Sequence, residues 1–176
     1  SMQQRVSLQF ELLDDAQEVA RETARVILAS AAEAGRRFRL VLAGGTTPMA
    51  AYRILAESEA DWDAWEIYFG DERCVPTTDP ARNSLAARDA FLGRVPIPRA
   101  QIFDIPAELG AEPAAEIYGR TVEAALPFDL VLLGMGEDGH TASLFPGHPI
   151  AVDALVQAVH GAPKPPSERV SLSPKA

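Results

Sequence analysis

Apolar and polar residues recur with regular periods along the chain, and these periods predict its strands and helices. Residues 5–12 alternate polar with apolar, a period of two that predicts a half-buried strand. Apolar residues over 16–31 recur at helical spacing, with Asp14 or Asp15 placed to cap the helix and Gly35 placed to end it. We therefore expect the chain to open with a strand followed by a helix.

Short, mostly apolar runs predict buried strands further along the chain. They lie at 39–43, 65–69 and 128–133, with weaker candidates at 102–105, 155–159 and 169–173. Helical patterns separate these runs at 48–56, just after residue 83 and at 111–125. Pro48 suits a first helical turn, Asn83 or Ser84 is placed to cap the next helix, and Pro127 ends the last one.

Strands that alternate with helices in this way predict an α/β fold with a mostly parallel sheet covered on both faces. In such sheets, ligands bind at the carboxyl ends of the strands. The length of 176 residues and the apolar fraction of 47% suit one domain, which we expect over residues 3–176. Residues 1–2, Ser-Met, are interpreted as a scar left by a cleaved tag.

Charge and composition narrow the class of ligand. Sixteen Lys and Arg residues against 25 Asp and Glu residues give a net charge of −9, so we expect no nucleic-acid partner. One small anion can still be held locally. All basic residues except Lys164 and Lys175 are arginines, whose planar guanidinium binds phosphate or carboxylate in bidentate fashion, although a genome rich in Arg codons explains most of them as well.

The cysteine content and the hydropathy set expectations about the compartment. Cys74 is the only cysteine, so no disulfide can form within the chain, and we expect a cytoplasmic protein. No stretch approaches the ~18 consecutive apolar residues of a membrane span, so we expect no association with membranes.

Three segments of unusual chemistry follow the three clearest strands. The first is Ala-Gly-Gly-Thr-Thr-Pro at 43–48, between a strand and a helix. Gly44 and Gly45 allow close approach of the backbone to a ligand, the helix start offers unpaired N–H groups, and Thr46 and Thr47 add hydroxyls. The segment suits a phosphate ester. The alternative is a tight turn in which Thr47 caps the helix.

The second segment is Gly-Asp-Glu-Arg-Cys-Val-Pro at 70–76. Asp71 and Glu72 are suited to position a substrate hydroxyl, accept a proton or orient Arg73, which in turn suits a phosphate or a developing oxyanion. The alternative is a solvated loop with an exposed ion pair. Cys74 is interpreted as a small apolar residue rather than a nucleophile.

The third segment is Leu-Gly-Met-Gly-Glu-Asp-Gly-His-Thr-Ala-Ser-Leu-Phe-Pro-Gly at 133–147. His140 titrates near neutral pH and is suited to take a proton from water and return it to a leaving oxygen, with Asp138 or Glu137 fixing its tautomer. The alternative is a histidine held at a helix start. The histidine spacing fits no metal-site pattern, so we expect no metal, and Ser143 lacks the sequence context of a nucleophilic serine.

In this order, the three segments resemble those of the 6-phosphogluconolactonase family, and the third matches without interruption. Asn83-Ser84 and the stretch 165–170 also fit that family. The resemblance implies a modified Rossmann-like, three-layer α/β sandwich, shared with sugar-phosphate isomerases and deaminases. It implies hydrolysis of 6-phospho-D-glucono-1,5-lactone, a sugar-phosphate substrate, to 6-phosphogluconate in the oxidative pentose phosphate pathway, without a metal or organic cofactor. We expect a monomer or weak homo-oligomer.

The resemblance also implies roles for individual residues. His140 is the general base toward water, and Asp138 and Asp71 orient the substrate or His140. A wider set of residues is implied to bind the substrate phosphate: Gly44, Gly45, Thr46, Thr47, Arg73 and Arg169. The chain departs from the family pattern at Ala43, where the family often has Ser, and at its end, where we expect a C-terminal truncation.

Two other functions compete with this interpretation. Glucosamine-6-phosphate deaminases share the fold, but that family usually has Tyr where Arg73 stands and an acidic residue in the stretch equivalent to 143–147. A non-catalytic sugar-phosphate sensor is the other alternative, but it has no need of His140 and the chain carries no helix-turn-helix region. These differences from the two alternatives favour the lactonase.

Overall fold

The computed structural model describes residues 16–134 and 154–176, and within them the strands form two three-stranded sheets. The order β2-β1-β4 makes a parallel sheet, and the order β3-β6-β5 makes an antiparallel one. The strands run over these ranges: β1 Phe38–Leu42, β2 Trp65–Phe69, β3 Asp71–Arg73, β4 Leu130–Val131, β5 Val156–Val159 and β6 Arg169–Leu172.

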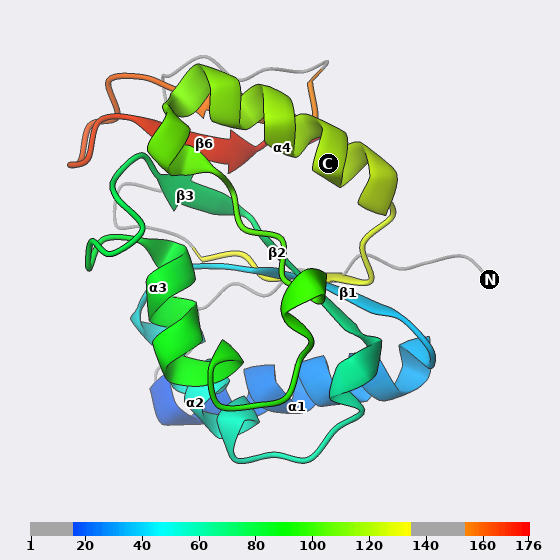
Figure 1. Ribbon diagram of the computed structural model, residues 1–176. Helices are drawn as coiled ribbons and strands as arrows, with labels where there is room; N and C mark the ends of the chain where they lie inside the picture. Colours follow the sequence, from blue (N-terminus) through cyan, green and yellow to red (C-terminus); the bar gives the residue numbers. More distant parts are fainter. Residues whose placement is uncertain (1–15, 135–153) are drawn as a thin grey trace.

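Helices separate and cover the strands (Figure 1). Helices α1 and α2 pack together on one side of the parallel sheet, whereas α4 packs on β5 and β6 on the other side. The α-helices are α1 Ala16–Ala34, α2 Thr46–Ala56, α3 Asn83–Ala87 and α4 Ala111–Ala125. Short turns of other helix types are η1 Trp62–Ala64, η2 Arg88–Leu92 (a π-helix), η3 Arg99–Gln101 and η4 Ala107–Leu109.

The predicted α/β fold with a parallel sheet is confirmed, and most element positions agree within one or two residues. Helix α1 ends at Ala34, and the next residue, Gly35, has a φ of 77°, the left-handed conformation expected of a glycine that terminates a helix. Helix α4 ends at Ala125, before the extended residue that precedes Pro127. The strand expected at 5–12 lies outside the described residues.

Other predictions need correction. The segment expected as a strand at 102–105 forms a single bridge from Ile102 to Ile67, because the carbonyl of Phe103 accepts a hydrogen bond from the hydroxyl of Tyr118 instead of a strand neighbour. The strands at 155–159 and 169–173 exist, but they pair antiparallel in a second sheet that the sequence did not indicate.

One apolar core joins the two sheets. Fully buried side chains of the parallel sheet, such as Leu40 and Ile67, share a cluster with Val170 of β6 and Tyr118 of α4. The carboxyl ends of β1 and β2 and the start of β6 lie on the same side of the molecule, at the left of Figure 1. Among the described residues, none of the helices combines the length and the apolar character needed to cross a membrane.

Candidate functional site

The first predicted segment forms a tight turn between β1 and α2. Gly45 has a φ of 110° and directly precedes α2, and no side chain among the described residues caps that helix end. Thr47 lies inside the helix, so the alternative in which it caps the helix is wrong. Because the N–H groups of the first turn have no partner within the helix, this turn can donate backbone hydrogen bonds to an anion.

Tyr52 braces this turn from inside the protein. Its hydroxyl donates to the carbonyl of Ala43 at 2.8 Å and accepts from the N–H of the same residue at 3.0 Å. Tyr52 is fully buried, and burial raises the pKa of its hydroxyl. A neutral phenol therefore fixes both polar backbone groups of the residue that precedes Gly44.

Gly44 lies against two other segments of the site. A Cβ added to Gly44 would meet Oδ1 of Asn83 at 2.5 Å, so a larger residue there would displace the asparagine. On the other side, a Cβ added to Gly134 would lie 3.4 Å from the carbonyl oxygen of Gly44. The glycine turn, α3 and the start of the third predicted segment therefore meet at the carboxyl ends of the parallel strands.

The second predicted segment is a strand rather than a solvated loop. β3 pairs with β6, so that Asp71 lies opposite Ser171 and Arg73 lies opposite Arg169. Side chains two residues apart on a strand share a face with their opposite partners, so Asp71 and the two arginines lie on one face of the antiparallel sheet. Asp71 is buried and accepts a hydrogen bond from Nδ2 of Asn83 at 3.1 Å.

Glu72 is fully buried and caps α3. Its Oε1 accepts from the N–H of Asn83 at 2.7 Å, and its Oε2 accepts from the N–H of Ser84 at 2.9 Å. The expected cap by Asn83 or Ser84 is therefore wrong, because a carboxylate from β3 binds the N–H groups that such a cap would serve. Burial raises the pKa of the Glu72 carboxyl, and the backbone hydrogen bonds and Arg82 oppose this effect.

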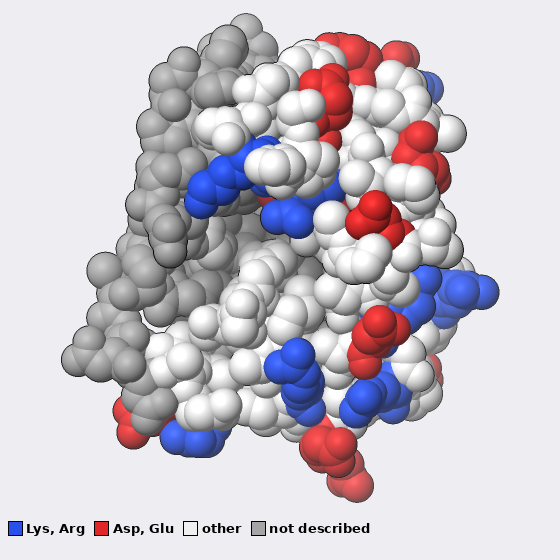
Figure 2. Space-filling view, turned by 90° about the vertical axis from the view of Figure 1, so that its left-hand side faces the viewer, with Lys and Arg blue, Asp and Glu red and all other residues white. Residues whose placement is uncertain are grey.

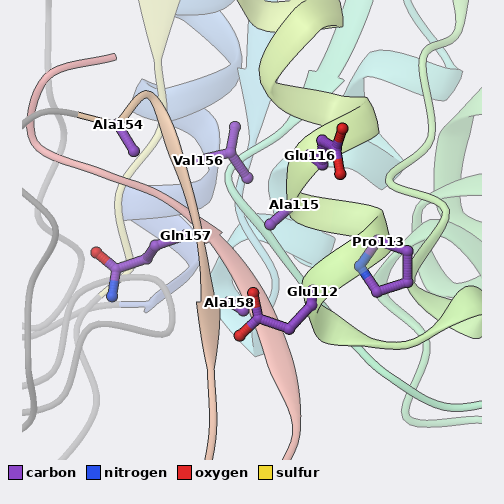
Figure 3. A pocket seen from close by; sticks show the side chains of 8 residues that line it. All are labelled: Glu112, Pro113, Ala115, Glu116, Ala154, Val156, Gln157 and Ala158. Carbon is purple, nitrogen blue, oxygen red and sulfur yellow. The ribbon is translucent and has the colours of Figure 1, made fainter.

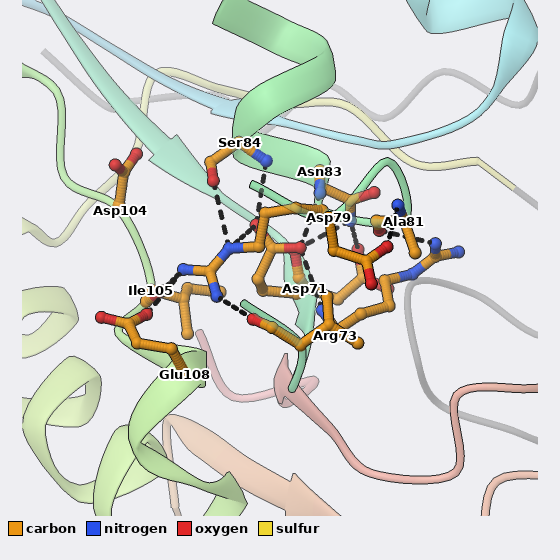
Figure 4. Close-up of polar contacts among 12 residues, drawn as sticks. Asp71, Arg73, Asp79, Ala81, Asn83, Ser84, Asp104, Ile105 and Glu108 are labelled. Carbon is orange, nitrogen blue, oxygen red and sulfur yellow. Dashed lines mark hydrogen bonds and ion pairs between the residues drawn. The ribbon is translucent and has the colours of Figure 1, made fainter. Parts of the chain in front are cut away.

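Arg82 completes this buried polar cluster (Figure 4). Its guanidinium lies 3.2 Å from Oε2 of Glu72 and 2.9 Å from Oε1 of Glu108, and it also donates to the carbonyl oxygens of Val75 and Ile105. The side chain is 1% exposed. With these bonds, the buried Arg82 side chain holds the surrounding elements in place.

The two arginines predicted to bind an anion are held differently. Arg169 is buried, and its guanidinium donates to the carbonyl oxygens of Lys164, Pro165 and Pro166. Arg73 is half-buried and donates from Nη1 to the carbonyl of Ala81, while its Nε is buried without a hydrogen-bond partner in the described part of the chain. Opposed like charges on neighbouring strands are unfavourable unless a counter-charge lies between or near them.

Figure 2 views the molecule from the side on which these strand ends lie, and it shows Lys and Arg side chains gathered around the upper edge of a hollow. The structure thus brings together Gly44, Asn83 and Asp71 by contact, with Gly45 next to Gly44 in the same turn. Arg73 lies opposite Arg169 in the register of β3 and β6. Thr46 and Thr47 lie in the first turn of α2 and are exposed and half-buried, respectively. Asp138 and His140 lie outside the described residues.

Sequence reasoning missed Arg82 and the capping role of Glu72. Arg82 resembles any other arginine of this Arg-rich chain, and its burial depends on carbonyl groups far along the sequence. Cys74, interpreted as a small apolar residue, is half-buried, and burial raises the pKa of its thiol to about 11. A protonated thiol is a poor nucleophile.

A separate surface groove of about 650 Å³ lies between α4 and β5 (Figure 3). Glu112, Glu116 and Gln157 supply its polar groups, and Ala115 and Val156 are among its apolar ones. Its two carboxylates disfavour an anion, and none of the predicted site residues lines it. Within residues 16–134 and 154–176, no group of three or more His, Cys, Asp or Glu side chains is arranged to hold a metal ion.

Comparisons with known proteins agree on one family. The family model described as glucosamine-6-phosphate isomerases/6-phosphogluconolactonase matches residues 3–176. A protein of Oryza sativa subsp. indica named probable 6-phosphogluconolactonase 3, chloroplastic, is 38% identical over 178 residues, which cover 90% of this chain and 54% of that protein. The 6-phosphogluconolactonase of Rattus norvegicus is 38% identical over 82% of this chain and 62% of its own length.

A solved structure shows the same architecture. The crystal structure of 6-phosphogluconolactonase from Thermotoga maritima superposes with a TM-score of 0.83 at 32% identity, covering 97% of this chain and 78% of that one. This likeness confirms the expected Rossmann-like α/β fold. The chain spans about half the length of the rice protein.

Proposed function

Because this chain belongs to the family of glucosamine-6-phosphate isomerases and 6-phosphogluconolactonases, we propose that the protein hydrolyses 6-phospho-D-glucono-1,5-lactone to 6-phosphogluconate. The rice, rat and Thermotoga maritima relatives are all named for this activity. The observation in the structure that carries the proposal is the opposition of Arg73 and Arg169 across β3 and β6, on the face that also bears Asp71. Two cations beside a carboxylate suit a substrate that has a phosphate at one end and a polar reacting group at the other.

The phosphate end of the substrate is assigned to the turn before α2 and to the arginines. The first N–H groups of α2 donate toward the phosphate, because that helix end has no side-chain cap among the described residues. Arg73 supplies a positive charge, and its buried Nε has no hydrogen-bond partner among the described residues. Arg169 is held by the carbonyl oxygens of residues 164–166 and adds a fixed positive charge.

The hydrolytic step is assigned to His140 on the strength of its sequence motif. His140 takes a proton from water, and the resulting hydroxide attacks the lactone carbonyl carbon to form a C–O bond. The intermediate collapses with cleavage of the bond between C1 and the ring oxygen, and His140 returns the proton to that oxygen. Asp138 and Asp71 orient His140 or the substrate. No metal or organic cofactor takes part in the proposed step.

The proposal also covers the location, the pathway and the oligomeric state of the enzyme. The single cysteine favours a cytoplasmic location for this chain, and the acidic composition favours a small-molecule substrate over nucleic acid. We assign the reaction to the oxidative pentose phosphate pathway and expect a monomer or weak homo-oligomer.

The proposal is tested with freshly generated lactone. Loss of the lactone is followed by NMR with and without the protein, because the lactone also hydrolyses spontaneously. We expect the protein to accelerate lactone loss and to release no ammonia from glucosamine 6-phosphate. Ammonia release without acceleration of lactone loss would show a deaminase instead.

A further inference from the structure

Asn83 occupies a position between two parts of the site that the proposed mechanism uses separately. Its side chain touches the Gly44 turn on one side and bonds to Asp71 on the other. We propose that Asn83 is a positioning residue that holds the phosphate-binding turn and Asp71 in a fixed relative geometry. This inference rests on the proposed function and deepens it.

The contact with Gly44 is a close one. The Cβ position of Gly44 lies 2.5 Å from Oδ1, 3.0 Å from Cγ and 3.2 Å from Nδ2 of Asn83, so the flat amide fills the space that a side chain would take. Any larger residue at position 44 requires the amide to move. Asn83 therefore requires a glycine at position 44, whether or not the backbone of Gly44 also contacts a phosphate.

The contact with Asp71 is made through the other edge of the amide. Nδ2 donates to both the backbone carbonyl and Oδ1 of Asp71, each at 3.1 Å. Both groups are buried, Asn83 and Asp71 each being 7% exposed. A neutral amide here fixes the Asp71 carboxylate without neutralising its charge.

Asn83 is itself held by the buried cluster beneath it. Its backbone N–H donates to Oε1 of Glu72 at 2.7 Å, and Arg82 lies 3.2 Å from the other oxygen of that carboxylate. The backbone of Asn83 is therefore held in place, so its side-chain amide does not move with the glycine turn if that turn shifts. A rigid link between turn and carboxylate suits a substrate whose phosphate and reacting carbon are separated by a fixed number of bonds.

A double-mutant cycle tests the link. We expect Gly44→Ala to lower kcat/KM for the lactone by at least about tenfold in the natural background, and to have little further effect in an Asn83→Ala background, where the clash partner is gone. The midpoint of urea unfolding should show the same non-additivity, which keeps the test valid where a variant has little activity. Equal effects of Gly44→Ala in both backgrounds, on activity and on stability, would overturn the inference.

The pH dependence of activity shows whether Asn83 positions the Asp71 carboxylate or only fills space. In Asn83→Asp, a second carboxylate faces Asp71, and two close carboxylates share a proton, so the acid limb of the activity profile should move to higher pH. Among the described residues, the charged groups on the same face are Arg73 and Arg169, Tyr52 of α2 lies near Asp71, and the Glu72 carboxylate accepts from the backbone N–H of residue 83. Lower activity with an unmoved acid limb would contradict the role assigned to Asn83.

Gln101→Ala is the matched control, because its side-chain amide also donates two hydrogen bonds, to the carbonyl oxygens of Asp63 and Trp65, at the opposite end of β2. We expect it to cost stability without moving the pH profile. If the proposed function is wrong, the unmodified protein will not accelerate lactone hydrolysis. The double-mutant cycle measured by urea unfolding would still test the contact between Gly44 and Asn83.

Discussion

At the scale of single residues, the charged side chains of the candidate site differ in how many hydrogen bonds they make to other protein groups. Arg82 and Glu72 are almost completely buried, and both are bonded to several partners. Arg73 is half-buried, and its Nε has no hydrogen-bond partner in the described residues. Among these residues, Arg73 is therefore the one expected to change its contacts when an anion binds.

The charge of Arg73 should determine how tightly inorganic phosphate competes with the substrate. Hydrogen bonds to charged groups contribute roughly 1.5–3 kcal/mol, so Arg73→Ala should weaken inhibition by phosphate by roughly 10- to 100-fold. Arg120→Ala removes an exposed arginine of α4 that pairs with Glu116, and it should leave the inhibition constant unchanged. Equal inhibition of Arg73→Ala and the unmodified protein would remove Arg73 from the phosphate site.

At the same scale, Arg82 should matter for stability rather than for binding. Its removal leaves Glu72 buried without its cation, and the loss of one partner from a buried pair costs about 3–5 kcal/mol. We expect Arg82→Ala to lower the free energy of unfolding in urea by this amount. The exposed pair broken by Arg120→Ala should cost under about 1 kcal/mol. Similar losses in the two variants would argue against a structural role for the cluster.

At the scale of elements, the antiparallel sheet is tied to α4 by a histidine. His160, directly after β5, lies 2.7 Å from Glu112 in the first turn of α4 and 2.5 Å from Glu168, just before β6. Hydrogen bonds with these two carboxylates raise the pKa of His160, and the bond with His160 lowers the pKa of Glu168. The loop between residues 160 and 169, which carries the carbonyl groups that hold Arg169, therefore has a pH-dependent attachment.

The sign of this pH dependence follows from the two pKa shifts. The raised pKa of His160 gives stability that is present below its ordinary pKa of 6.5 and is lost as pH rises through the value in the folded protein. The lowered pKa of Glu168 gives stability that is present above 4.5 and is lost as pH falls further. The attachment should therefore be strongest between about pH 5 and pH 6.5.

Two substitutions on one helix test the attachment. Glu112→Gln should lower the unfolding midpoint at pH 6 and have a smaller effect at pH 9, where less of His160 is protonated. Glu116→Gln, one turn away, removes a carboxylate that pairs with Arg120 instead, so its effect should be the same at pH 6 and pH 9. Identical behaviour of the two variants would contradict the account of His160.

The parallel half of the fold could be predicted because its strands are short, mostly apolar runs that are followed by glycine. The antiparallel sheet could not, since β3 consists of Asp71, Glu72 and Arg73 and pairs with β6 almost a hundred residues later. A charged triplet indicates a loop until its partner is known. The same limit applies to the site: glycine and charged motifs indicated its position, but the contact of Asn83 with Gly44 arises from packing alone.

At the scale of the whole molecule, a net charge of −9 coexists with a hollow that has Lys and Arg side chains at its upper edge (Figure 2). Backbone N–H groups of α2 and two opposed arginines provide local positive charge, which suits a small anion and not a polyanion. The names of the rice and rat relatives support a sugar-phosphate lactone as the substrate proposed for this chain.

Lactone hydrolysis by this chain, with His140 as the base, is the function proposed above. The most direct measurement compares the loss of freshly generated 6-phosphogluconolactone in the presence of the unmodified protein and of His140→Ala, each corrected for spontaneous hydrolysis. General acid–base groups typically contribute 10²–10⁴-fold, so we predict that His140→Ala loses at least about 100-fold in kcat while its urea unfolding midpoint stays close to that of the unmodified protein. Equal rates for the two proteins, well above the spontaneous rate, would contradict the account.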